Sequence, residues 1–135
     1  MNELNITKIK LTDLQEKILI KYHNNPDFTV IYKELDIKPI TLSKALQTLK
    51  FKGLIDEENI TILGKEIVNY YLFRNDTISK FLEKSNITDE ILFNELKRLD
   101  LKIIIAIRNL LNNWSSFTID KKYNNNSYNS NYSNN

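Results

Sequence analysis

The sequence predicts a mainly α-helical chain that contains a helix-turn-helix, a short two-stranded hairpin and further helices after the hairpin. First, the stretch FTVIYKELDIKPITLSKALQTLKFKGLI, residues 28–55, carries apolar residues at helical spacing on both sides of a turn at residues 36–39. Second, a short β-prone run, ITIL at residues 60–63, follows an acidic turn. Third, apolar stripes of helical spacing continue after this run as far as residue 114.

Length and composition restrict the chain to one small domain with at most a tail. With 135 residues, of which 41% are apolar, it can bury one core. It has no cysteine, which excludes disulfides and thiolate metal sites. No apolar run approaches the roughly 20 residues needed to cross a membrane, and the start of the chain lacks the apolar centre of a signal peptide. We therefore expect a soluble cytoplasmic protein.

A first helix is expected from about Thr12 to His23, after a flexible stretch over residues 1–10. Thr12 and Gln15 have the spacing of a capping box, in which each side chain accepts a hydrogen bond from the backbone N–H of the other residue. The buried face of this helix consists of Leu14, Ile18, Leu19 and Tyr22. Residues 24–27 then form a loop.

The helix-turn-helix follows as two short helices joined by a tight turn. Asp36 to Pro39 cannot continue the first helix, because the residue before a proline is displaced from the α region. Pro39 can open the second helix, since its missing N–H costs nothing at that position. Gly53 is expected to end the second helix as a C-cap. The apolar stripes of the two helices are Val30, Ile31 and Leu35, and then Leu42, Ala45, Leu46 and Leu49.

A small hairpin, which we call the wing, is expected after the second helix. Residues 54–55 and 60–63 are its strands, and the acidic residues 56–59 are its tip. Three helices are expected after the wing: one from Gly64 to about Lys84, one capped by Thr88, and an Ile-rich one from about residue 101 to residue 114.

The segments after the wing carry more apolar surface than one small domain needs, and such surplus is typical of a symmetric dimer interface. We divide the chain into a flexible N-terminus (1–10), a winged helix-turn-helix domain (11–63), a helical dimerisation region (64–116) and a disordered tail rich in Asn, Ser and Tyr (117–135). The expected dimer interface consists of Ile103, Ile104, Ile107, Leu110, Leu111 and Trp114. In the alternative arrangement these helices pack only on the first helix of the same chain.

The second helix of the motif, about residues 40–52, corresponds to the helix that enters the major groove in helix-turn-helix proteins. On its outer face, Lys44 can contact phosphate or guanine, Gln47 can pair with adenine, and Ile40 can touch a thymine methyl group. Lysines beside this face can contact phosphate, which sets the register on DNA without reading sequence. The expected DNA-binding residues are Lys38, Ile40, Thr41, Ser43, Lys44, Gln47, Thr48, Lys50 and Lys52.

Charge is unevenly distributed along the chain. Residues 1–55 carry nine lysines and six acids, residues 56–100 carry six bases and ten acids, and residues 101–135 carry four bases and one acid. The helix-turn-helix therefore lies in a part of the chain where basic residues outnumber acidic ones. The acidic tip of the wing would repel phosphate and is the best argument against DNA binding.

The order of elements resembles winged helix-turn-helix repressors, above all the metal-dependent repressors of the diphtheria-toxin-repressor and manganese-repressor type. The resemblance covers about Leu11 to Trp114 and rests on residues 28–55 and on LGKEIVNYYLFRNDTISKFLEKSNITDEILFNELKRLD, residues 63–100. Repressors of the multiple-antibiotic-resistance (MarR) type are similar at LTDLQ (11–15) and LGKEIV (63–68), although the long helix that usually precedes is missing.

The metal site that this resemblance implies is degenerate in this chain. The acid pair of the first helix is present as Asp13 and Glu16, but Asn75 stands at the position of a histidine ligand. Lys97, Asp100 and Leu101 stand where the family has a Glu followed by a Glu-His pair. Because half of the ligand positions lack a ligand, we expect no metal and no other cofactor.

No enzyme is expected from this sequence. The two glycines lie far apart, which excludes a Gly-rich phosphate loop, and one histidine without cysteine gives no nucleophile–base set.

We expect instead a sequence-specific transcriptional regulator, a repressor, that binds double-stranded DNA as a homodimer and does not bind membranes. The alternative is a winged-helix module that binds another protein through the same helix face and does not bind DNA.

Overall fold

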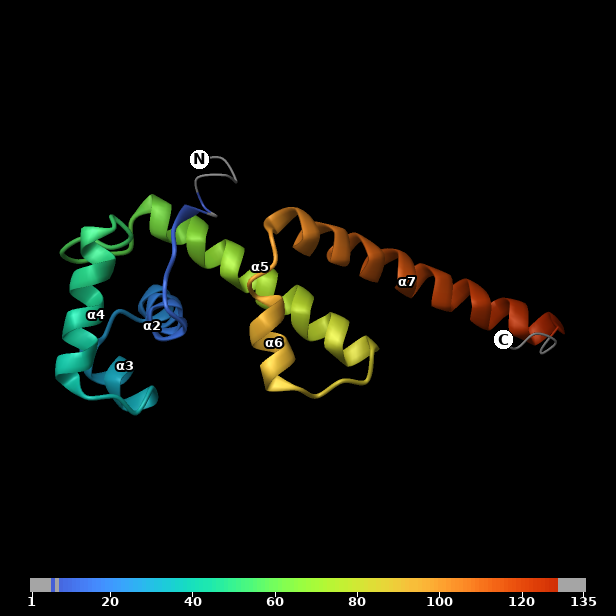
Figure 1. Ribbon diagram of the computed structural model, residues 1–135, viewed down its shortest axis with the longest axis horizontal. Helices are drawn as coiled ribbons and strands as arrows, with labels where there is room; N and C mark the ends of the chain where they lie inside the picture. Colours follow the sequence, from blue (N-terminus) through green and yellow to red (C-terminus); the bar gives the residue numbers. More distant parts are fainter. Residues whose placement is uncertain (1–5, 7, 129–135) are drawn as a thin grey trace. The chain divides into compact units, whose positions relative to one another are not determined.

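The computed structural model describes residue 6 and residues 8–128 of the chain, with side chains described up to Trp114 (Figure 1). All secondary-structure elements in the described part are helices, and no strand occurs there. The predicted mainly α-helical class is therefore confirmed. With the labels of Figure 1, the helices are α2 (Asp13–Asn24), α3 (Phe28–Glu34), α4 (Pro39–Phe51), α5 (Ile62–Lys84), α6 (Glu90–Leu96) and α7 (Leu101–Tyr128).

The predicted two-stranded wing is wrong. Between α4 and α5, a single isolated bridge pairs Ile55 with Ile60. Ile62 and Leu63, which were expected to extend the second strand, form the first turn of α5 instead. The winged helix-turn-helix is thus reduced to a helix-turn-helix followed by a tight acidic turn.

Thr61 and Gly64 explain why helix α5 replaces the second strand. The backbone N–H of Gly64 donates to Thr61 Oγ1 at 3.0 Å, which caps the helix at its first turn. The Thr61 hydroxyl lies 2.7 Å from the carbonyl oxygen of Gly53 and 3.0 Å from that of Leu54. Gly64 approaches the preceding turn so closely that a Cβ would lie 2.1 Å from the Leu54 carbonyl oxygen. Thr61 therefore caps α5 directly after the Ile55–Ile60 bridge, and the residues that follow it belong to the helix.

Helices α3, α4 and α5 end in the same backbone motif, with a residue in the left-handed region just past the helix. This residue is Asp36 (φ 54) after α3, Gly53 (φ 80) after α4 and Asn86 (φ 57) after α5. At the end of α4, the N–H of Leu54 donates to the carbonyl oxygen of Leu49 at 3.0 Å, the long bond of a Schellman motif. Gly53 lies one residue past the C-cap, Lys52, and ends α4 as predicted.

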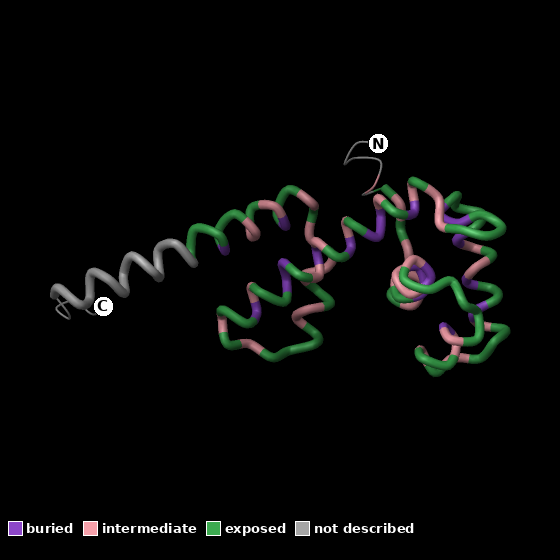
Figure 2. The backbone as a smooth tube through the Cα atoms, turned by 180° about the vertical axis from the view of Figure 1, so that it is seen from behind, coloured by how far each residue is buried: buried purple, intermediate pink, exposed green. Residues whose placement is uncertain are grey.

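The chain divides into two compact units, Met1–Arg74 and Asn75–Asn135, and α5 contributes to both. In the first unit, α4 packs against α2 and α3. The capping box of Thr12 and Gln15 that opens α2 is confirmed. The buried core gathers on the facing sides of these helices and of the start of α5 (Figure 2), and consists of Ile18, Leu19, Tyr22, Ile31, Leu42, Ala45, Leu49, Leu54, Ile55, Ile67, Val68 and Tyr71.

The second unit consists of the C-terminal part of α5 with α6 and α7. Its buried side chains are Thr77, Ile78, Leu82, Ile104 and Leu111. The N-cap of α6 is Asp89 rather than the predicted Thr88, because the Asp89 carboxylate accepts from the N–H groups of Ile91 (2.9 Å) and Leu92 (3.2 Å).

Both ends of the chain fall partly outside the described residues. The structure describes α7 as a helix to Tyr128, which extends into the stretch 117–135 where a disordered tail is predicted, and residues 129–135 lie outside the description. The flexible N-terminus predicted for residues 1–10 lies mostly outside it as well. Within the described part, no helix is both long enough and apolar enough to cross a lipid bilayer.

Candidate nucleic-acid interface

Helix α4 turns one face into the first unit and leaves the opposite face open. Leu42, Ala45 and Leu49 are buried and recur every three or four residues, and Leu46 packs beside them, so Ser43, Lys44 and Gln47 on the other side of the helix point away from the core. Ile40, at the start of the helix, remains 59% exposed although it is a large apolar side chain. The open face is therefore a continuous surface along α4, which we call the α4 face.

The structure places every residue of the predicted DNA-binding set on or beside the α4 face. The set contains no buried residue: Thr41 and Thr48 are half-buried, and Lys38, Ile40, Ser43, Lys44, Gln47, Lys50 and Lys52 are exposed. The Thr48 hydroxyl donates to the carbonyl oxygen of Lys44 at 3.3 Å, so part of its hydrogen-bonding capacity is used within the helix.

The start of α4 suits a negatively charged partner. Pro39 occupies the first turn, Lys38 is the N-cap, and this turn contains no acidic residue. The positive end of the helix dipole is thus not neutralised by a carboxylate of the same turn. A phosphate group beside Lys38 would meet both a cation and this dipole.

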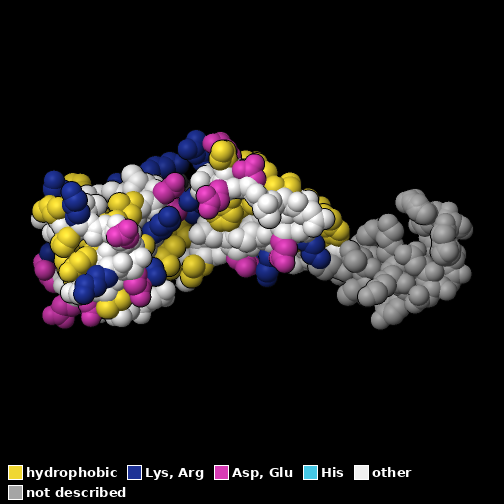
Figure 3. Space-filling model, turned by 90° about the horizontal axis from the view of Figure 1, so that it is seen from below, with side chains coloured by type: hydrophobic (Ala, Val, Ile, Leu, Met, Phe, Trp, Pro, Cys, Tyr) yellow, Lys and Arg dark blue, Asp and Glu magenta, His cyan; other side chains and the backbone are white. Residues whose placement is uncertain are grey.

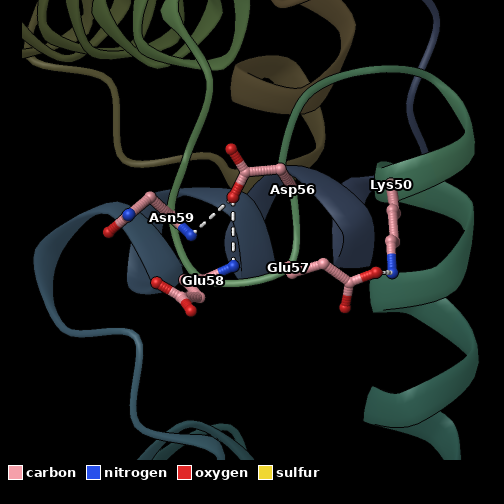
Figure 4. Close-up of polar contacts among 5 residues, drawn as sticks. All are labelled: Lys50, Asp56, Glu57, Glu58 and Asn59. Atoms are coloured by element: carbon pink, nitrogen blue, oxygen red, sulfur yellow. Dashed lines mark hydrogen bonds and ion pairs between the residues drawn. The ribbon is translucent and has the colours of Figure 1, made fainter.

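The acidic turn lies beside the other end of α4 (Figure 4). The Asp56 carboxylate accepts from the backbone N–H groups of Asn59 (2.8 Å) and Glu58 (3.0 Å). These two bonds hold the pKa of Asp56 below its usual value of 3.8, with a smaller contribution from the Lys50 charge. Asp56 therefore stays ionised and shapes the turn that presents Glu57 and Glu58.

Glu57 forms an ion pair with the ammonium group of Lys50, one of the predicted phosphate contacts (Figure 4). Both side chains are largely exposed, and such surface pairs contribute only about 0–1 kcal/mol. A DNA phosphate could replace Glu57 as the partner of Lys50, but it would meet the negative charges of the turn. The acidic turn thus weakens the phosphate-binding capacity of this end of α4.

Two exposed apolar residues on either side of the acidic turn were not among the predicted site residues. Phe51, in the last turn of α4, is 91% exposed, and Ile62 at the start of α5 is also exposed. Phe51 lies off the buried stripe of Leu42, Ala45 and Leu49, so its helical position could have indicated this exposure from the sequence. A large exposed aromatic side chain is a candidate contact for a macromolecular partner.

The face of the molecule seen in Figure 3 is not uniformly basic. Over the N-terminal unit, at the left of this view, Lys and Arg side chains are intermixed with acidic and hydrophobic ones. A surface of this kind does not attract DNA by net charge alone, so recognition would depend on specific contacts of the α4 face.

The predicted dimer-interface residues divide into two groups. Ile104 and Leu111 are buried inside the second unit of their own chain. They are therefore not available to contact a partner, contrary to the prediction. Ile103, Leu110 and Trp114 are exposed, and Ile107 is half-buried. These four recur at intervals of four, three and four residues on the outer face of α7, which is the spacing of a coiled-coil seam.

Glu16, one of the acids at the implied metal site, is bound by Arg74 of α5. Arg74 Nη2 lies 2.7 Å from Glu16 Oε1, and both side chains are mostly removed from solvent. Among the described residues, no group of three or more His, Cys, Asp or Glu side chains lies close enough together to hold a metal ion.

No protein-family model matches this chain, and no curated protein is significantly similar to it. The resemblance to metal-dependent and MarR-type repressors therefore stays a prediction.

Proposed function

We propose that this chain is a sequence-specific DNA-binding transcriptional regulator that acts in the cytoplasm as a homodimer, with α4 in the major groove. The observation that supports this proposal is the α4 face itself. A short helix held by its buried stripe presents Lys44, Gln47 and Ile40 outward, in a geometry that suits contact with base edges.

Each residue of the α4 face has a chemical role in this proposal. Gln47 presents an amide that can bond both N6 and N7 of adenine, and Ile40 can pack on a thymine methyl group. Lys44 can contact guanine or phosphate, with Thr41, Ser43 and Thr48 beside these contacts. Lys38, Lys50 and Lys52 would fix the register through phosphates. Occupation of an operator excludes other proteins from it, so repression is the effect that we propose.

Homodimerisation would supply the affinity that one helix lacks. No arginine lies on α4 and one of its lysines is paired with an acid, so a single copy would bind DNA weakly. The outer seam of α7, formed by Ile103, Ile107, Leu110 and Trp114, offers an apolar surface for a second copy. Lys102, Ala106, Asn109 and Asn113 flank this seam, and a nearly uncharged border does not oppose self-association.

Binding of duplex DNA at several salt concentrations tests this proposal. The affinity for random duplex should fall steeply with salt, because each phosphate contact contributes about −0.9 to the logarithmic slope. Selection of bound sites from a random pool should then return a two-fold symmetric sequence. Lys44→Gln should weaken binding to the selected site, whereas Lys17→Gln, an exposed lysine of α2, should not. Absent or salt-insensitive binding would contradict the proposal.

A second candidate function is protein binding without DNA, which the exposed Phe51 and Ile62 beside the acidic turn favour. In that case Phe51→Ala or Ile40→Ala would abolish capture of a protein partner, and no DNA sequence would be selected. The DNA experiment above distinguishes the two functions directly.

A further inference from the structure

The second unit contains a pocket between the C-terminal part of α5 and α7. Its volume is about 440 Å³, and its lining consists of Lys80, Glu83, Lys84, Arg108, Leu111 and Asn112. This volume lies within the roughly 300–1,000 Å³ of small-molecule sites. None of these residues belongs to the α4 face or to the seam of α7, so neither DNA binding nor dimerisation uses the pocket.

The charge of the pocket lining favours an anion. Three of its side chains, Lys80, Lys84 and Arg108, are cations, and only Glu83 is an acid. Lys84 is exposed, and none of the ion pairs in the described part of the chain includes it. Three cations around one small pocket repel one another, and an anionic ligand would relieve this repulsion.

Arg108 is held in place before any ligand arrives. Its Nε donates to Thr77 Oγ1 at 3.0 Å, and Thr77 is completely buried. Its Nη2 lies 2.6 Å from Asp76 Oδ2, and Lys80 Nζ lies 3.3 Å from the same oxygen. Asp76 offsets part of the positive charge but, together with Thr77, also holds Arg108 beside the pocket. Such preorganisation reduces the entropy lost when a ligand binds.

We propose that this pocket binds a small organic phosphate. The phosphate group lies between Lys84, Lys80 and Arg108, because a doubly charged tetrahedral group can accept charge-assisted hydrogen bonds from several cations at once. The organic part lies against Leu111 and the methylene stems of the two lysines, which bury apolar surface while their ammonium groups face the phosphate.

Titration of the ¹⁵N-labelled full chain with phenyl phosphate, followed by amide NMR, tests this proposal. Phenol serves as the uncharged ligand of equal ring size, and sodium chloride serves as the ionic-strength control. We expect saturable shifts centred on residues 80–84 and 108–112 with phenyl phosphate, and no saturation with phenol or with chloride.

Two lysine variants provide the matched comparison. Lys84→Gln should weaken phenyl phosphate binding about three- to fivefold, the factor that corresponds to one exposed charge pair. Lys102→Gln, which removes an exposed lysine of α7 outside the pocket, should leave the affinity unchanged. Equal effects of the two variants, binding of phenol as tight as that of phenyl phosphate, or shifts centred elsewhere would each overturn the proposal. Unchanged spectra of the unliganded variants will show that both are folded.

Discussion

Arg74 and Glu16 form a mostly buried ion pair that joins α5 to α2 across 58 residues of sequence. Two contacts link the groups, Nη2 to Oε1 at 2.7 Å and Nη1 to Oε2 at 3.4 Å. The Arg74 guanidinium carbon also lies 4.8 Å from the centre of the Tyr71 ring. Burial raises the pKa of the Tyr71 hydroxyl, and the Glu16 charge raises it further, so the ring remains neutral beside the pair. This cluster fixes α2, which packs on α4, to the long helix α5.

Removal of one partner of this pair should destabilise the fold strongly. Glu16→Gln leaves the Arg74 charge buried with a neutral partner, and we expect a loss of about 3 kcal/mol in the free energy of unfolding measured with urea. Glu34→Gln, which breaks the exposed pair with Lys21, should cost less than about 1 kcal/mol. The double variant Glu16→Leu with Arg74→Met should recover most of the loss. Equal small losses in both single variants would show that the buried pair is not a main support.

The two glycines should respond differently to a methyl group. Gly64→Ala places a Cβ against the Leu54 carbonyl oxygen, and the required displacement should cost about 2–3 kcal/mol. Gly53→Ala meets no atom within 4 Å, and its left-handed backbone alone should cost about 1 kcal/mol. Thermal and urea unfolding of both variants measure the difference. A smaller loss for Gly64→Ala would contradict the tight closure between α4 and α5.

Neutralising the acidic turn should strengthen DNA binding if the proposed function holds. Glu57→Gln removes a negative charge and releases Lys50 for a phosphate, so the logarithmic salt slope should become steeper by about 0.9 per copy. Glu58→Gln removes an equal charge without releasing Lys50, so it should raise the affinity with a smaller change of slope. Fluorescence anisotropy with labelled duplex measures both quantities. Identical slopes would mean that Lys50 contacts no phosphate.

The contribution of Asp56 to the stability of the fold should change with pH. Because its pKa is lowered in the folded protein, the ionised carboxylate contributes stability above pH 3.8, and this contribution is lost as the pH falls through the lower folded pKa. Asp56→Asn keeps an oxygen that can accept from Asn59 and Glu58 but loses the charge. The variant should be less stable than the parent at pH 6, and the difference should shrink below pH 4, as urea unfolding can measure. A difference that stays constant with pH would exclude a role for the charge.

The seam of α7 should control the oligomeric state. Leu110→Glu places a charge in the middle of the apolar seam, so sedimentation velocity should show a shift from dimer to monomer. Asn109→Glu adds the same charge at the exposed border of the seam rather than within it, and should weaken the dimer much less than Leu110→Glu. A monomeric parent protein, or equal dissociation of both variants, would contradict the assignment of the seam.

Local signals in the sequence were sufficient for most helix ends in the first unit. The capping box of Thr12 and Gln15, the proline at the start of α4 and the glycine just after it each act through bonds between residues close in sequence. Asp36, by contrast, adopts a left-handed backbone that was not predicted, although Asp is one of the few residue types that enter this region. The error at the wing has a similar origin, because ITIL suits a strand as well as a helix and the capping by Thr61 decided between them.

The sequence by itself determined the mainly α-helical class, the helix-turn-helix and the outward position of Lys44 and Gln47, because helical periodicity and capping act over a few residues. Only the tertiary structure decided that Arg74 would pair with Glu16, and that Ile104 and Leu111 would be buried while Leu110 stays exposed. Each of these depends on which surfaces meet when helices pack. That choice minimises exposed apolar area and unpaired charge over the whole unit, and no short window of sequence contains the information for it.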